Sequence, residues 1–201
     1  MYSDRIHHAL AFAAKHYPER VSRYDGESGL IRASSVAVIL ARFGADESTI
    51  VASILKHLAG ACPPDRQLSL GQDILRKFGP TVALTVDGAA EPRFDTLSRA
   101  RTWKACRFSQ LARLSTVGPA AIDVCLAEEL HRIGAALVAI RRLGIEYLDP
   151  AGEPTPEDTR WWLGALGETL RLHPTWRRHE MFAEFRRLSL ELGERLGEAG
   201  R

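Results

Sequence analysis

The sequence DESTIVASILKHLAGA, residues 46–61, has the pattern of a helix, in which an apolar run is followed by the polar residues Lys56 and His57. Apolar side chains recur at the three- and four-residue spacing of a buried helix face, at Ile50, Val51, Ile54, Leu55 and Leu58. Asp46 stands just before this run, where an aspartate caps a helix. The stretch therefore predicts a core helix that carries Lys56 and His57 beside its buried face.

The remainder of the 201 residues also predicts helices, joined by short loops. The expected helices are residues 3–17, capped by Ser3, then 36–41, begun by Ser34 or Ser35 and ended by Gly44, and further 70–78, 80–87, 95–114, 119–143, 156–172 and 176–196. No stretch has the alternation of a strand, and no internal repeat occurs. We expect an all-α fold in a single globular domain over residues 1–201.

Composition and charge exclude several classes of protein. Hydrophobic residues make up 45% and charged residues 26% of the chain, as in globular proteins that bury a core. The net charge is only +2, and the basic residues are interleaved with acidic ones in most segments. We therefore expect no nucleic-acid partner. No run approaches the about 18 apolar residues of a membrane span, and the polar N-terminus lacks the apolar core of a signal peptide. We expect a cytoplasmic protein.

Other patterns suggest little chemistry. Cys62, Cys106 and Cys125 lie far apart, and we expect small buried side chains rather than a zinc site or disulfides. Glu128 and His131 form an E-x-x-H pair, but a carboxylate-bridged metal site needs a second such pair on a facing helix, and none is evident. Nucleophile-elbow, P-loop and dinucleotide-binding motifs are absent.

Two adjacent tryptophans, Trp161 and Trp162, stand within a predicted helix. Adjacent side chains on a helix point about 100° apart, so we expect one of the two to be partly exposed. Core packing and an interface such as a dimer surface are both compatible with the pair.

Five segments occur in a characteristic order, namely FAAKH at residues 12–16, VAVIL at 36–40, SILKHLAGA at 53–61, KFGPTVALTVDG at 77–88 and LAEELHR at 126–132. In this order they resemble the hydrolase domain of RelA/SpoT proteins. The resemblance is closer to small stand-alone alarmone hydrolases of the HD phosphohydrolase family, such as the metazoan SpoT homologues. It covers about residues 3–145 and implies an HD-domain helical fold, on which helices from 155–196 would pack.

The resemblance also implies where a metal ion would bind. In the family, two histidines and two aspartates hold a divalent ion, usually manganese, which activates water for attack on a phosphate ester. Those ligand positions fall here on Arg32, Lys56, His57 and Glu128, and the family's water-positioning Glu-Asp pair falls on Gly60 and Ala61. Arginine stays protonated, and lysine binds a metal only as the neutral amine. We therefore expect no manganese cofactor and a catalytically inactive, degenerate phosphohydrolase.

Three functions remain open for such a site. The cations could form an anion pocket in which Arg20, Arg32, Lys56, His57 and Glu128 line the binding site of a phosphorylated nucleotide such as (p)ppGpp. They could instead close onto Glu128 as a salt-bridge cluster, leaving a scaffold that binds a protein partner or a second copy. An active hydrolase with atypical ligands is the third. An open cationic pocket would favour the first, and a filled core with an apolar patch the second.

Overall fold

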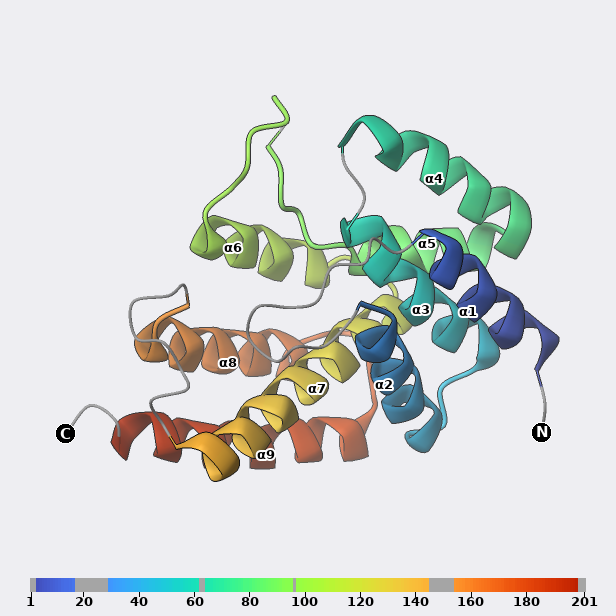
Figure 1. The fold of residues 1–201 in the computed structure, drawn as a ribbon. Helices are drawn as coiled ribbons and strands as arrows, with labels where there is room; N and C mark the ends of the chain where they lie inside the picture. The colour runs from blue at the N-terminus through green and yellow to red at the C-terminus, as the bar shows by residue number, and fades with distance from the viewer. Residues whose placement is uncertain (1–2, 17–28, 62–63, 96, 145–153, 199–201) are drawn as a thin grey trace. The chain divides into compact units, whose positions relative to one another are not determined.

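The computed structural model describes residues 3–16, 29–61, 64–95, 97–144 and 154–198. Within them the chain forms nine helices (Figure 1), which are α1 Asp4–His16, α2 Gly29–Arg42, α3 Glu47–Ala61, α4 Pro64–Phe78, α5 Pro80–Ala89, α6 Trp103–Leu114, α7 Pro119–Leu143, α8 Pro156–Arg171 and α9 His179–Glu198. The described residues hold no strand, only an isolated bridge between Phe94 and Ala100. The all-α prediction is confirmed. None of the described helices has the length and apolar character needed to span a membrane.

The chain divides into two compact units. Unit 1 comprises Met1–Glu91 and Gly118–Glu128, and unit 2 comprises Pro92–Val117 and Glu129–Arg201. The first residues of α7 thus belong to unit 1 and the rest of that helix to unit 2. The prediction of a single domain stays a prediction.

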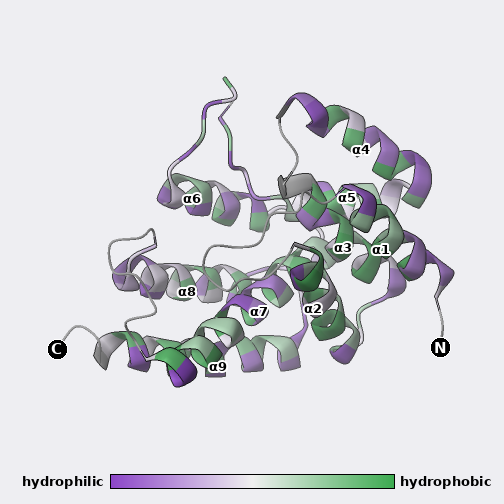
Figure 2. Cartoon of the chain, in the orientation of Figure 1, coloured by the Kyte–Doolittle hydropathy of each residue, from purple (hydrophilic) through white to green (hydrophobic). Residues whose placement is uncertain are grey.

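Unit 1 is built around α3, which packs against α1, α2, α4 and α5. The sequence predicted one buried face for α3, but every residue from Thr49 to Lys56 is buried. Figure 2 accordingly shows α3 as largely hydrophobic, whereas α4 is predominantly hydrophilic with hydrophobic patches. The predicted caps are confirmed, because Ser3 Oγ accepts from Ile6 N at 3.1 Å and Asp46 Oδ1 from Thr49 N at 3.0 Å. A helix buried on all sides leaves its polar residues no face in water.

Unit 2 contains α6, α8, α9 and the later part of α7. Its core includes the fully buried Trp162, Leu166, Met181 and Phe185. Trp161, the neighbour of Trp162, is half-buried, so the prediction that one tryptophan of the pair is partly exposed is confirmed. The helix α8 starts with a capping box in which Thr155 and Asp158 bond each other's backbone. Cys106 and Cys125 are buried free thiols as predicted, in units 2 and 1, and Cys62 lies outside the described residues.

Four helices start elsewhere than predicted, and one of them is α9, which begins at His179 rather than at Trp176. The helix α2 begins at Gly29, upstream of Ser34, because Leu30 and Ile31 continue the helical run and serine is only mildly unfavourable inside a helix. The helix α4 begins at Pro64 rather than at residue 70, since proline suits a first helical turn. The helix α6 begins at Trp103 rather than at Asp95.

The late start of α6 has a local cause. The Asp95 carboxylate accepts from the backbone nitrogens of Leu97 and Arg99, at 2.8 and 2.9 Å, and holds these residues in a turn. Thr102 then caps α6 by accepting from Ala105 N at 3.3 Å. Side-chain bonding to the backbone thus competes with the helix at residues 95 and 97–101.

Candidate functional site

Three side chains that the sequence singled out meet inside unit 1. Lys56 and His57 come from α3, and Glu128 comes from the part of α7 that belongs to this unit. The Lys56 ammonium contacts Oε2 of Glu128 in a hydrogen-bonded ion pair. Nε2 of His57 lies 3.3 Å from the other carboxylate oxygen, Oε1. Both oxygens of Glu128 therefore face a nitrogen of α3, and we call this group the α3–α7 cluster.

The cluster is sheltered from water because of where α3 lies. The side chain of Lys56 is only 7% exposed and that of Glu128 is 26% exposed. Nδ1 of His57 lies 3.3 Å from the carbonyl oxygen of Ser53, one turn earlier. The imidazole thus presents both ring nitrogens to oxygen acceptors, a carbonyl and a carboxylate.

Opposite charges keep both members of the ion pair ionised. Burial alone would lower the pKa of Lys56, but Glu128, with further contributions from Cys125 and Glu91, raises it above the usual 10.5. Burial would likewise raise the pKa of Glu128, yet Lys56 and His57 hold it well below the usual 4.5. The ammonium and the carboxylate are each other's counterion.

The sequence analysis missed Cys125 and Glu91 as neighbours of this charge. Cys125 stands one turn before Glu128 on α7, so the i, i+3 spacing could have placed the two on the same face. Its thiol lies 3.7 Å from the carbonyl oxygen of Ala89. Glu91 follows α5, and no signal in its local sequence indicates its place.

For the other predicted site residues, the structure gives a helix but no contact with the α3–α7 cluster, or does not describe the residue. Gly60 and Ala61 form the last turn of α3. Arg32 is half-buried on α2, and its membership of the α3–α7 cluster stays a prediction. Arg20 lies outside the described residues.

A divalent ion does not fit this set of donors. A metal ligand must direct a lone pair at the ion, and an ammonium has none. Glu128, which could ligate, has its oxygens directed at Lys56 and His57. Among the described residues, no three or more His, Cys, Asp or Glu side chains are grouped as a metal site would require. The chemistry of the residues present therefore disagrees with a metal centre at this position.

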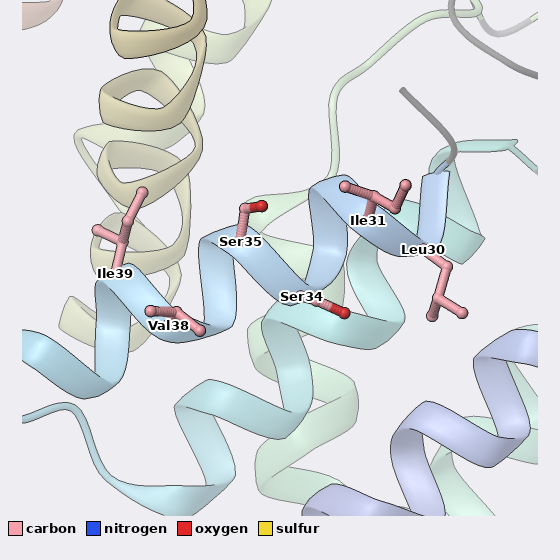
Figure 3. Close-up of a pocket in the computed structure, with 6 residues that line it drawn as sticks. All are labelled: Leu30, Ile31, Ser34, Ser35, Val38 and Ile39. Atoms are coloured by element: carbon pink, nitrogen blue, oxygen red, sulfur yellow. The ribbon is translucent and has the colours of Figure 1, made fainter. Parts of the chain in front are cut away.

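A hollow of about 520 Å³ lies elsewhere in unit 1, along one face of α2 (Figure 3). Its lining combines apolar side chains with two hydroxyls, from Leu30, Ile31, Ser34, Ser35, Val38 and Ile39. None of these lining residues is charged, so this hollow has no counterion for a phosphate.

The sequence of this chain matches a known family. A family model described as HD domain matches residues 9–136. This chain belongs to the HD domain family. The match spans all of the segments on which the resemblance rested, so that prediction is confirmed. No curated protein sequence is significantly similar to this HD domain.

The solved structures that share its fold include two of low sequence identity. One, a metazoan ortholog of SpoT that hydrolyzes ppGpp, superposes with a TM-score of 0.72 at 15% identity, over 96% of this chain and 98% of the other. The other, lmo0812 from Listeria monocytogenes EGD-e, has a TM-score of 0.66 at 19% identity, over 81% of this chain and 99% of the other. At such identities the likeness establishes the HD fold.

Proposed function

We propose that this protein is a metal-independent HD domain without phosphohydrolase activity, and that it functions as a scaffold by binding another polypeptide. The observation that carries the proposal is the buried ion pair between Lys56 and Glu128. In the family these positions belong to metal ligands, whereas here the ammonium supplies the positive charge that the carboxylate needs. The lack of phosphohydrolase activity follows because a water molecule cannot be activated there without the ion.

The closed state of the α3–α7 cluster also bears on nucleotide binding. A phosphate entering the site would have to compete with Glu128 for Lys56, and it would then lie beside a carboxylate in a poorly hydrated environment. Lys56 is too buried to act as an exposed anion-binding residue. These points favour the scaffold over a sensor of phosphorylated nucleotides.

The decisive experiment combines an activity assay with a binding assay on one preparation. We expect no release of pyrophosphate from ppGpp in manganese, under conditions in which the metazoan SpoT ortholog, as the positive control, turns over. We also expect no heat of ppGpp binding by calorimetry, with manganese or with EDTA. The melting temperature should be the same in both buffers, because no ligand stabilises the native state.

Two outcomes would contradict the proposal. Turnover of ppGpp that depends on manganese would restore the hydrolase interpretation. Binding of ppGpp that persists in EDTA, without turnover, would replace the scaffold by a nucleotide sensor. In that case Arg20 and Arg32 would become the residues to substitute first.

A further inference from the structure

A buried histidine holds the turn between α8 and α9 in unit 2 (Figure 1). His173 follows the end of α8 and is only 6% exposed. Its Nδ1 atom accepts hydrogen bonds from the backbone nitrogens of Trp176, at 3.1 Å, and of Thr175, at 3.4 Å. A single ring nitrogen is thus the acceptor for two consecutive N–H groups of this turn.

These bonds fix the protonation state of the ring. A backbone N–H group can only donate, so Nδ1 of His173 has to present a lone pair. The closed turn therefore requires the neutral imidazole, with its proton on Nε2. An imidazolium carries a proton on both nitrogens and could accept neither bond. The closed turn and the protonated ring exclude each other.

Arg177 bonds the carbonyl groups of the same turn. Its guanidinium donates to the backbone oxygen of His173 at 3.1 Å and to that of Trp176 at 2.8 Å, and it also bonds the oxygen of Pro174. Within the residues that the structure describes, no other charged side chain bonds to His173. A cation on the same turn disfavours a second positive charge on the imidazole.

No carboxylate offsets that charge. In the described parts of α6, α7, α8 and α9, no aspartate or glutamate forms an ion pair with the imidazole of His173. Glu168, near the end of α8, pairs with Arg171, and Glu180, in the first turn of α9, is exposed. The surroundings of His173 therefore favour its neutral form.

The closed turn keeps an aromatic side chain inside unit 2. Trp176 is 5% exposed, and its ring meets that of Phe182 on α9 edge to face, with the ring centres 6.0 Å apart. Phe182 stacks in the same way on the fully buried Phe185, with ring centres 6.3 Å apart. An open turn would release Trp176 from this contact and bring its indole into water.

We propose that His173 is a pH-sensitive switch, which closes the turn when the imidazole is neutral and opens it when the ring takes up a second proton. In the open turn both ring nitrogens are solvated, and the N–H groups of Thr175 and Trp176 bond to water instead. The switch loosens the start of α9 on mild acidification. It needs no ligand, so it goes beyond the scaffold function and does not depend on it.

The direction of the pH dependence follows from the number of bound protons. The pKa of a solvated imidazole is about 6.5. Below about pH 6.5 the open turn binds one proton more than the closed turn, so acid favours opening. The equilibrium constant for opening should rise about tenfold between about pH 7.5 and about pH 5.5.

The test is the hydrogen exchange of the Trp176 amide, followed by NMR on the full-length protein at these two pH values. After correction for the intrinsic exchange rate, we expect about tenfold weaker protection at the lower pH. A long-range proton–nitrogen correlation spectrum of the His173 ring should show Nδ1 without a proton at the higher pH. Both measurements use the wild type, so neither depends on the folding of a variant.

Two variants separate His173 from the other titrating groups. His173→Asn keeps a side-chain acceptor for the backbone of the turn but cannot titrate, so protection of the Trp176 amide should be equal at both pH values. His179→Gln removes the exposed histidine that begins α9, and the wild-type change should persist. Far-UV circular dichroism establishes that both variants are folded.

Several results would overturn the inference. Equal protection of the wild-type Trp176 amide at both pH values would mean that protonation does not open the turn. A change that survives in His173→Asn, or that disappears in His179→Gln, would assign the pH dependence to another group. A proton found on Nδ1 of His173 at the higher pH would contradict the closed geometry itself.

Discussion

The proposed loss of a metal site depends most on the side chain of Lys56. Replacing it by methionine keeps the volume but leaves the Glu128 carboxylate without its nearest cation. We expect Lys56→Met to lower the free energy of unfolding by about 2–3 kcal/mol, somewhat below a fully buried pair because Glu128 is partly exposed. The double variant Lys56→Met with Glu128→Gln should recover more than half of the loss. Urea denaturation measures both, and a single-variant loss within error would contradict the counterion role.

The contribution of this ion pair depends on pH in a defined way. The pKa of Glu128 is lowered, so its stabilisation is present above the usual 4.5 and is lost as the pH falls through the native-state value. The pKa of Lys56 is raised, so its stabilisation is present below the usual 10.5 and is lost as the pH rises through the native-state value. The advantage of the wild type over the double variant should therefore be constant between about pH 5 and pH 10 and decline on either side. A dependence confined to the region near neutral pH would point to another group.

How far the site was predictable from the sequence differs from residue to residue. A pairing of Lys56 with Glu128 was one of the alternatives that the sequence left open, and it rested on the family resemblance, which assigns both residues to metal-ligand positions. His57 directly follows Lys56 in α3, so a contact of Lys56 with Glu128 also brings His57 near the same carboxylate. The electrostatic influence of Glu91 was not predictable, since it stands beyond the end of α5, where local sequence does not determine the position of a side chain relative to α3.

At the scale of the helices, two glycines between elements should differ in their tolerance of a side chain. Gly44 ends α2 with φ of 69°, and the bonds Gly44 N to Ala41 O and Ala45 N to Leu40 O form a Schellman motif. Gly79 precedes α5 with φ of 89° and ψ of 171°, a region open almost only to glycine. A Cβ would meet no atom within 4 Å at either position, so only backbone conformation distinguishes them.

We expect Gly79→Ala to lower the free energy of unfolding by about 2–3 kcal/mol and Gly44→Ala by about 1 kcal/mol. Gly44→Asn should be milder still, because asparagine tolerates the left-handed conformation. Thermal and urea unfolding of the three variants provide the comparison. Equal losses for the two alanine variants would mean that backbone strain does not decide their stability.

Helix boundaries were predictable where a side chain caps the helix and no other side chain bonds to the backbone of the same segment. The bounds of α7 and the start of α8 at Pro156 agree with the prediction, as does the cap of α3 by Asp46. The predicted start of α6 was wrong because the Asp95 carboxylate accepts hydrogen bonds from backbone nitrogens of its own turn. Helical spacing in the sequence does not reveal such bonds. Burial of α3 on all sides was also beyond the sequence, since Lys56 and His57 indicated a polar face.

For the molecule as a whole, the chain passes between the two units three times, and one passage lies inside α7. Glu128 is the last residue of unit 1 in that helix, and Glu129 is the first residue of unit 2. Interrupting a continuous helix at this point would remove several backbone hydrogen bonds. The ion pair of Lys56 with Glu128 therefore anchors to unit 1 a helix whose larger part belongs to unit 2.

This continuity predicts that the two units unfold together. The four tryptophans, Trp103, Trp161, Trp162 and Trp176, all belong to unit 2, so tryptophan fluorescence follows that unit, whereas far-UV circular dichroism follows both. We expect the two signals to give one coincident urea transition. Lys56→Met in unit 1 and Phe185→Leu in the core of unit 2 should each shift both signals equally. If Lys56→Met moved the dichroism transition and left the fluorescence transition in place, the units would be separate domains and the prediction of a single domain would be wrong.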